Sequence, residues 1–353
     1  MADVQKGKLA FFLVGSTLLI TFSFYAYQIV YTPNILVDRE PKVFLIEKGS
    51  TFRSVQNDLD RGGFVNDMVS FSFLARLMDY DKSIRPGLYS LHPNMTNLEA
   101  IRVLRSGEQV PVNIVINNVR LLPELGQKIT KNTSVTPEEF DQALQDFIDS
   151  NHEGFTRDNI LCMFIPNTYE VYFDLSADDL VERMNTEYNI FWSAKRKQKA
   201  DSIGLTPVEV SILASIVRAE ASKMEEAGRI AGLYLNRLRR NIPLQADPTL
   251  VFAVGDFALK RILNEHKQVD SPYNTYRNAG LPPGPINMPS IPFLDAVLNA
   301  EKHKYIYMCA REDFSGYHNF ARTLSEHNQN ASKYQRALTA EQRKGRAAAQ
   351  RRK

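Results

Sequence analysis

The sequence predicts an α+β protein of two or three folded units that follow a single membrane-spanning helix. Three observations lead to this fold class. They are an uncharged apolar run near the N-terminus, strand-like runs between capped helices over residues 40–110, and a longer, mostly helical part over residues 111–340. The 353 residues are too many for one small core, and a hydrophobic content of 44% is typical of globular proteins.

The apolar run covers residues 9–31 and contains no charged residue. As a helix it would be roughly 34 Å long, which is enough to cross a bilayer. It is too long for the apolar part of a cleaved signal peptide, and no small-residue cleavage site closes it. Lys6 and Lys8 precede the run, whereas Asp38 and Glu40 follow it. The positive-inside rule therefore predicts that residues 1–8 are cytoplasmic and that the chain beyond residue 35 lies outside.

Residues 40–110 show the pattern of a small α+β unit. Ser50 or Thr51 can cap one helix, two glycines at 62 and 63 end it, and Thr96 with Glu99 forms a capping box for another. The expected elements are a strand at 43–46, helices at 52–60 and 67–78, a strand at 87–91, and a helix from 97 to about 106.

The next part begins with a strand and continues as helices. Residues 112–119 are rich in β-branched side chains and predict a strand, and residues 164–169 predict a strand or the edge of a loop. Hydrophobic periodicity predicts helices at 123–131, 137–150 and 177–201. Thr206, Pro207 and Glu209 then form a strong helix start, with a capping box and a proline in the first turn.

The helix that begins at Pro207 carries a carboxylate on its apolar face. Glu220 lies three, four and seven positions after apolar residues, whereas Arg218 points about 200° away at 100° per residue. Desolvation should raise the pKa of Glu220, as a general acid at neutral pH requires. The alternative is a core glutamate that is paired with Arg229 or Arg237 on the next helix, which we expect at 224–240.

The segments after residue 240 lose helical periodicity and are rich in Gln, Asn, Thr, Tyr, Pro and Gly. Such side chains hydrogen-bond and stack on sugars, and prolines hold loops rigid. Each segment alone could be ordinary turn chemistry. Together with Glu220 they predict a carbohydrate-binding cleft. The segments are residues 245–249, 272–277, 280–285, 316–320 and 323–328.

Charge and metal-ligating residues exclude several classes of function. The net charge is +3, but the last thirteen residues alone contribute +5, so the rest of the chain is slightly acidic and does not suit nucleic acid. We expect the basic tail, residues 341–353, to be disordered, with a contact to anionic lipid as the alternative. Cys162 and Cys309 lack ligand spacing, and the six histidines form no i, i+4 pair, so we expect no metal and no cofactor. Two buried thiols are favoured over a disulfide.

Several long motifs resemble the MltG-type (YceG-like) endolytic lytic transglycosylases. Residues 40–108 resemble the LysM-like subdomain of that family, which suggests a LysM-like unit at 40–110 and a YceG-like catalytic domain at 111–340. Arg218 departs from the family, in which many members have a glutamate at this position. The matching runs are residues 166–169, 213–220, 230–232, 236–238, 243–249, 273–276, 280–286 and 318–328.

The resemblance implies cleavage of the MurNAc–GlcNAc β-1,4 bond inside peptidoglycan strands, which leaves 1,6-anhydroMurNAc ends. It also implies that the enzyme terminates strand elongation beside peptidoglycan synthases, from a single-pass anchor in the bacterial inner membrane. Its expected partners are therefore glycan strands and, as a hypothesis, a synthase. Two alternatives remain, a muramidase-type hydrolase and a non-catalytic glycan-binding protein of the wall-synthesis machinery.

Glu220 is the expected catalytic residue, first as the acid and then as the base that takes a proton from the C6 hydroxyl of the substrate. Asp247 could instead cap a turn or serve as the second carboxylate of a muramidase. His318 could instead hold a loop. The expected substrate-binding residues are Gln245, Asp247, Thr249, Tyr273, Asn274, Thr275, Tyr276 and His318.

Overall fold

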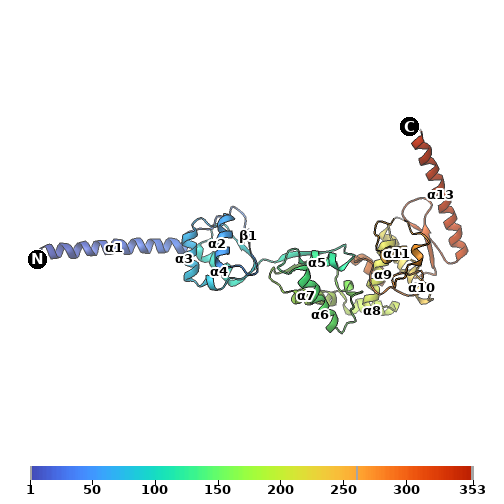
Figure 1. Cartoon of the computed structure of the whole chain (residues 1–353), viewed down its shortest axis with the longest axis horizontal. Coiled ribbons are helices and arrows are strands. Elements are labelled where there is room, and N and C mark those ends of the chain that lie inside the picture. The colour runs from blue at the N-terminus through green and yellow to red at the C-terminus, as the bar shows by residue number, and fades with distance from the viewer. Residues whose placement is uncertain (1, 260, 351–353) are drawn as a thin grey trace. The chain divides into compact units, whose positions relative to one another are not determined.

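A computed structural model describes residues 2–259 and 261–350, without the side chains of residues 2–6 and 345–350. The chain is mixed α+β and divides into two compact units (Figure 1). Unit 1 comprises residues 1–114, 130–136 and 170–176, and unit 2 comprises residues 115–129, 137–169 and 177–353. The second unit contains Glu220 and the loops that the sequence indicates.

Unit 1 contains one antiparallel pair of strands that is packed against short helices. Strands β1 (Lys42–Ile46) and β2 (Gly87–Leu91) pair with Phe44 opposite Tyr89, and both of these rings are buried. The helices α2 (Phe52–Arg61), α3 (Met68–Leu77) and α4 (Asn97–Ser106) agree with the expected ranges to within one residue at each end. Thr51 and Thr96 both form capping boxes. A 3-10 turn, η1 (Tyr80–Lys82), follows α3.

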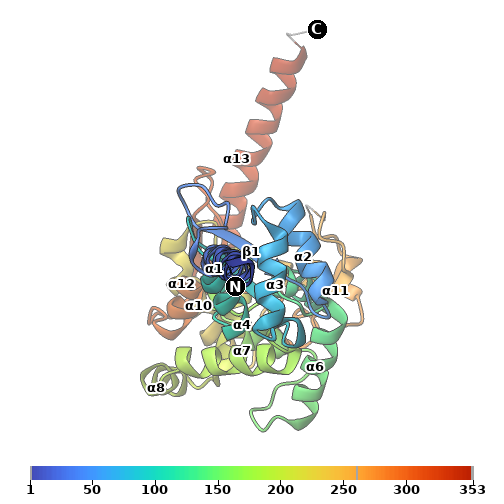
Figure 2. The ribbon, with the colours of Figure 1, turned by 90° about the vertical axis from the view of Figure 1, so that its left-hand side faces the viewer.

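The N-terminal helix α1 (Ala2–Tyr31) belongs to unit 1 and is viewed nearly along its axis in Figure 2. Its residues 7–31 form a helix that is long and apolar enough to cross a membrane. Its C-terminal end is fastened to the unit, because the Asn97 side-chain amide donates to the Ile29 carbonyl at 2.9 Å. The amide of Asn34 also donates to Asn97 Oδ1 at 2.7 Å, and both asparagines are buried.

Unit 2 is mostly helical. Strands β3 (Val112–Ile116) and β4 (Asn167–Val171) pair with each other, and β5 (Tyr307–Ala310) pairs antiparallel with β6 (His318–Ala321). The buried helix α9 packs against α10, α11 and α12. The α-helices are α5 (Leu122–Thr130), α6 (Pro137–Ser150), α7 (Ala177–Phe191), α8 (Ala194–Ile203), α9 (Pro207–Glu220), α10 (Ala227–Arg239), α11 (Asp247–Val254), α12 (Ile291–Leu298) and α13 (Leu324–Gln350). The 3-10 turns are η2 (Ile160–Met163), η3 (Met224–Glu226) and η4 (His266–Gln268).

Several elements of unit 2 differ from the prediction. The single helix expected at 177–201 is broken at residues 192–193 into α7 and α8. The segments expected as loops contain the start of α11, most of β6 and the start of α13, and neither β5 nor α12 was predicted. Apart from α13, these elements are only four to eight residues long, and periodicity is weak over so few residues.

The expectation of a disordered basic tail is also wrong where the structure describes it. Helix α13 continues through Gln350 and projects beyond the rest of unit 2 (Figures 1 and 2). The segment after Glu341 is rich in Ala, Arg, Lys and Gln, which have high helix propensity, and this explains the extension. The last three residues of the expected tail lie outside the described residues.

Candidate functional site

Helix α9 presents Glu220 as its last residue. The helix begins as predicted: Glu209 N–H donates to Thr206 Oγ1 at 3.2 Å, and Thr206 N–H donates to Glu209 Oε2 at 2.7 Å. Residues 210–217 are all buried, whereas Glu220 is partly exposed. The buried residues of α9 therefore fix the position of the Glu220 carboxylate at the solvent-accessible end of the helix.

The ion pair that would make Glu220 a core residue is not formed. Arg229 pairs instead with Glu301 at 2.9 Å, and the guanidinium of Arg237 donates to backbone carbonyls. The hydrogen bond that the structure gives Glu220 comes from Tyr234 of α10, whose hydroxyl donates to Glu220 Oε1 at 3.1 Å. The alternative of a paired core glutamate is therefore wrong.

The surroundings of Glu220 favour its neutral form. Burial raises the pKa of its carboxyl from 4.5 to about 7, the Tyr234 hydrogen bond lowers it, and the charge of Asp247 raises it. The negative end of the α9 dipole also disfavours a charged carboxylate at the last residue of the helix. A carboxyl group with a pKa near 7 can both give and take a proton at neutral pH.

Two pockets meet at Glu220 and Asp247, which line both of them. The larger pocket has a volume of about 650 Å³, and the smaller pocket has a volume of about 260 Å³. Arg218 lines neither pocket, in agreement with the helix geometry. Its guanidinium donates instead to the Met288 carbonyl and to Asn118 Oδ1.

The smaller pocket is lined by polar groups from four different segments. Its wall includes Tyr234 and Arg237 of α10, Gln245, Tyr276 and His318. The Tyr276 hydroxyl donates to Asp247 Oδ1 at 2.6 Å, so one oxygen of this carboxylate is fixed. The structure thus brings Gln245, Asp247, Tyr276 and His318 together with Glu220.

The backbone before Asp247 is strained and is fixed by hydrogen bonds to Thr275 and Arg237. Gln245 has φ of 51°, a left-handed conformation that is unfavourable for a residue with a side chain. Its N–H donates to the Thr275 carbonyl at 3.0 Å, the Ala246 N–H donates to Thr275 Oγ1 at 3.1 Å, and Arg237 donates to Gln245 Oε1 at 3.1 Å. These bonds fix where α11 begins, and therefore where Asp247 lies.

The other four predicted binding residues line neither pocket. Thr249 and Thr275 are buried with their hydroxyl oxygens 2.8 Å apart, and Asn274 is buried with its amide on the Lys267 and Val269 carbonyls. Tyr273 packs on Phe252, with 4.7 Å between the ring centroids. All four side chains lie behind the pocket walls and support them.

The larger pocket is lined by residues that sequence reasoning missed. Arg120, Phe257 and Arg261 are among them, together with apolar side chains of α11. The Arg120 guanidinium lies 4.1 Å from the centroid of the Phe257 ring. Arg120 is one hundred residues from Glu220 in the chain, so no local pattern connects the two.

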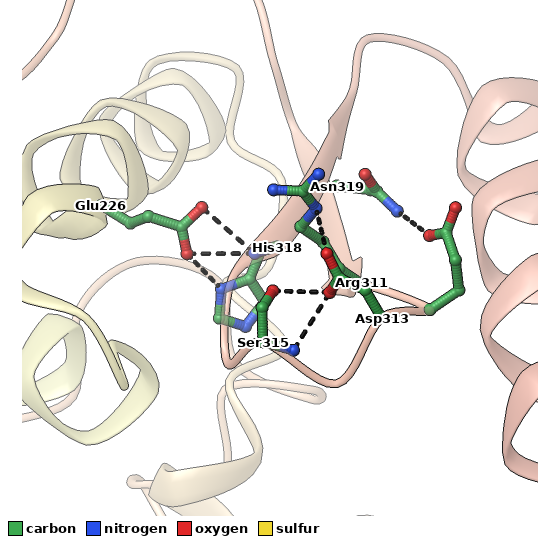
Figure 3. Close-up of polar contacts among 7 residues, drawn as sticks. Glu226, Arg311, Asp313, Ser315, His318 and Asn319 are labelled. Atoms are coloured by element: carbon green, nitrogen blue, oxygen red, sulfur yellow. Dashed lines mark hydrogen bonds and ion pairs between the residues drawn. The ribbon is translucent and has the colours of Figure 1, made fainter. Parts of the chain in front are cut away.

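The β5–β6 hairpin is attached to the start of α10 by a buried carboxylate (Figure 3). Glu226 is 4% exposed, and its oxygens accept from the His318 backbone N–H at 3.0 and 3.1 Å. The Nδ1 atom of His318 lies 3.0 Å from Glu226 Oε2. At the turn of the hairpin, Asp313 accepts from the Ser315 backbone N–H at 3.0 Å.

Replacing Glu226 by Gln should destabilise unit 2. Both carboxylate oxygens of Glu226 accept from the His318 N–H, whereas the amide of glutamine has one oxygen and an NH₂ group that would face this donor. We expect the free energy of unfolding to fall by roughly 1–3 kcal/mol. Thermal unfolding measures the effect. Glu225→Gln is the matched control, because Glu225 is the exposed neighbour. If both variants unfold at the temperature of the parent, Glu226 does not hold the hairpin.

Neither thiol is in a disulfide. Cys162 is buried as expected, whereas Cys309 lies in β5, is partly exposed and lines the smaller pocket. The expectation of two buried thiols is therefore wrong for Cys309. Burial raises the pKa of both thiols, which favours the unreactive neutral form. In the described part of the chain, no three His, Cys, Asp or Glu side chains gather as a metal site.

Comparison with known proteins identifies relatives that match most of the chain. Two strains of Streptococcus pneumoniae have an "endolytic murein transglycosylase" that is 26% identical over 360 residues, covering 92% of this chain. The chain spans 64% of the length of these relatives. A Bacillus subtilis protein of the same name is 26% identical over 306 residues, with 82% of this chain and 83% of that protein covered.

A crystal structure of a yceG-like protein from Listeria monocytogenes is similar in fold. It matches with a TM-score of 0.51 and 25% identity, and the match covers 83% of this chain and 99% of that one. The family model of the YceG-like family matches residues 44–333, a range that includes both pockets except Tyr334. The chain therefore belongs to the YceG-like family.

Proposed function

We propose that this chain is an endolytic lytic transglycosylase that cleaves the MurNAc–GlcNAc β-1,4 bond within peptidoglycan strands and leaves 1,6-anhydroMurNAc ends. The observation that carries the proposal is the carboxyl group of Glu220, which has a pKa of about 7 and lies where two pockets meet, while the neighbouring Asp247 has one oxygen bound by the Tyr276 hydroxyl. The names of the relatives from S. pneumoniae and B. subtilis support it.

In the proposed mechanism Glu220 first gives one proton and then takes another. Protonated Glu220 donates to the glycosidic oxygen as the bond to C1 breaks and an oxocarbenium-like state develops. The donated proton leaves on the O4 hydroxyl of the departing GlcNAc. The C6 hydroxyl of the same MurNAc then attacks C1, and the proton of this hydroxyl passes to Glu220, which restores the protonated acid. Neither water nor a protein nucleophile is consumed. The Tyr234 hydroxyl on Oε1 stabilises the carboxylate between the two transfers and leaves Oε2 for the substrate.

The sugar contacts follow from the pocket lining. Gln245, Asp247, Tyr276 and His318 would bind the substrate, because they line the smaller pocket with Glu220. Their hydroxyl, amide and imidazole groups supply the donors and acceptors that a sugar ring needs. Thr249, Tyr273, Asn274 and Thr275 would instead act by holding this wall in place.

A muramidase is the second candidate, because Asp247 lines the same two pockets as Glu220. In that reaction water replaces the C6 hydroxyl, and a second carboxylate assists it. Hydrolysis leaves reducing ends, which are one water heavier than anhydro ends. Mass spectrometry of digested peptidoglycan therefore distinguishes the two reactions, and no cleavage at all by purified protein would leave only the glycan-binding role.

The expected location of α1 and unit 1 is compatible with a peptidoglycan substrate. We assign α1 as a single-pass anchor in the bacterial inner membrane, with residues 1–8 cytoplasmic and both units outside, and we assign residues 40–110 as LysM-like. An enzyme in this place could end nascent strands beside a peptidoglycan synthase. A reporter that is active only outside the cytoplasm, fused after Lys353, should be active. Activity from a cytoplasmic reporter alone would contradict the topology.

A further inference from the structure

We propose that the larger pocket binds the peptide stem of the MurNAc residue and that Arg120 and Arg261 bind carboxylates of this stem. The inference rests on the proposed function, since it assigns part of the same substrate to a second region of the site. It makes stem-bearing glycan, rather than bare glycan, the preferred substrate.

The two pockets differ in chemistry. The smaller pocket is lined mainly by hydroxyl, amide and imidazole groups, which suit a neutral sugar, and the guanidinium of Arg237 in its wall already donates to backbone carbonyls and to Gln245 Oε1. The carboxylates of Glu220 and Asp247 line both pockets. The larger pocket has an apolar wall that includes Val251, Phe252 and Phe257, and two guanidinium groups at Arg120 and Arg261. A stem peptide combines small apolar side chains with free carboxylates, so its chemistry matches the larger pocket.

The two arginines are available for an anionic ligand. Within the described residues, the ion pairs of the structure involve neither Arg120 nor Arg261, and both residues are exposed. The carboxylates that line the larger pocket are Glu220 and Asp247, and Asp247 Oδ1 accepts from Tyr276. Guanidinium groups bind carboxylates through paired, charge-assisted hydrogen bonds.

The position of Arg120 is fixed relative to Glu220. Residues 118–120 form a turn that is held from both sides, because Arg218 of α9 donates to Asn118 Oδ1 at 2.8 Å and the Met288 N–H donates to the Val119 carbonyl at 2.8 Å. The carboxylate of Glu124 accepts from the backbone N–H of Arg120 at 2.9 Å. The helix that carries Glu220 thus also positions the turn that carries Arg120.

Two aromatic rings of the larger pocket lie next to the segment that carries Arg120. Arg120 lies over the Phe257 ring, and the Phe257 and Phe252 centroids are 6.2 Å apart. An adjoining hollow of about 430 Å³ shares Arg120 with the larger pocket and adds Arg218 and Glu124, whose carboxylate accepts from the Arg120 backbone N–H. Burial, followed by the nearby charge of Arg120, lowers the pKa of Arg218, so the two cations lie close together.

The test compares stem-bearing strands with the same strands after an amidase has removed the stems. We expect the kcat/KM of the parent protein to be at least about tenfold higher for stem-bearing strands than for stem-free strands. This is the size of effect expected from charge-assisted hydrogen bonds. In the double variant Arg120→Ala/Arg261→Ala, the ratio of the two values should fall to about one. The change should lie mainly in KM, because the arginines are placed beside the peptide and not beside the reacting atoms.

Two further variants control for charge. Arg239→Ala/Arg240→Ala removes the same charge from the exposed end of α10, outside both pockets, and should keep the ratio of the parent. Arg120→Lys/Arg261→Lys keeps the charge but loses the planar fork, and should keep only part of the preference.

The outcomes separate the stem inference from the proposed function. A parent without preference, or a double alanine variant with the ratio of the parent, would overturn the stem inference. So would a preference for stem-free strands that the double variant loses, because the arginines would then bind the lactyl carboxylate. If the parent cleaves neither substrate, the proposed function fails. Cosedimentation of Glu220→Gln with the two kinds of strand then still decides whether Arg120 and Arg261 bind stems.

Discussion

Replacing Glu220 by Gln should reduce the cleavage of peptidoglycan by roughly a thousandfold or more, since the same group acts as acid and as base and each role contributes 10²–10⁴-fold. The amide has the size of the carboxyl group and can still accept from Tyr234, so we expect the variant to fold and to bind glycan. Release of soluble fragments from purified peptidoglycan measures the loss. The control is Glu225→Gln, an exposed residue outside both pockets, which should cleave like the parent.

The same substitution should stabilise unit 2 at neutral pH. The pKa of Glu220 is about 7 in the folded protein against an ordinary 4.5, so the folded state binds the proton more tightly. Stability from this group is therefore complete below about pH 4.5, is lost as the pH rises to about 7, and stays low above that. The glutamine of Glu220→Gln does not titrate. Above pH 7 the free energy of unfolding of this variant should therefore exceed that of the parent by on the order of 2 kcal/mol, a figure that allows for the partial exposure of Glu220.

Measuring melting temperatures of Glu220→Gln and the parent at pH 4.5 and pH 8 checks this expectation. The variant should be more stable than the parent only at the higher pH. Loss of stability at pH 8 would instead indicate that the carboxylate of Glu220 is an ion-paired part of the core.

Replacing Arg237 by Ala should cause a large loss of stability in unit 2. Arg237 is 7% exposed. Its guanidinium donates to the Ile306, Pro243 and Leu244 carbonyls at 2.6, 3.0 and 3.1 Å. Its removal leaves buried acceptors without donors, each at a cost of roughly 1–3 kcal/mol. We expect a loss of about 3 kcal/mol or more, and a melting temperature that is lower by roughly 6–12 °C.

Arg239→Ala is the matched control for Arg237→Ala, because it removes an exposed arginine two residues further along α10. It should change the melting temperature little. Arg237→Ala should also lower activity, since Arg237 donates to the side-chain oxygen of Gln245, whose backbone is strained, and thereby supports the wall that carries Asp247. Equal melting temperatures for the two variants would show that Arg237 does not hold this wall.

The parts of the fold that could be predicted are those whose signals are local. Capping residues and periodicity predicted α2, α4 and α9 closely, because each helix contains its own start signal and an apolar stripe. The short helix α11 has apolar residues around its circumference and an alanine at its N-cap, so neither a stripe nor a side-chain cap was available, although Pro248 stands in its first turn. The β5–β6 hairpin depends on Glu226, ninety-two residues before His318, and no local pattern reports that contact.

The candidate site shows the same division. Glu220 could be found because a carboxylate on an apolar helix face is visible in one turn of sequence. Residue type also indicated Gln245, Asp247, Tyr276 and His318, which do line a pocket with it. The same reasoning could not separate these from Asn274 and Thr275, which are equally polar but buried. Burial depends on tertiary packing, and Arg120 joins the site through packing alone.

The most direct test of the account is the mass of the new glycan ends made by the purified parent protein. If Glu220 acts alone and the C6 hydroxyl attacks C1, every new MurNAc end should be a 1,6-anhydro end, one water lighter than a hydrolysis product. Digestion in H₂¹⁸O should then leave the new ends unlabelled. Reducing MurNAc ends that carry ¹⁸O would contradict the single-carboxylate mechanism and would assign Asp247 the role of a second catalytic carboxylate.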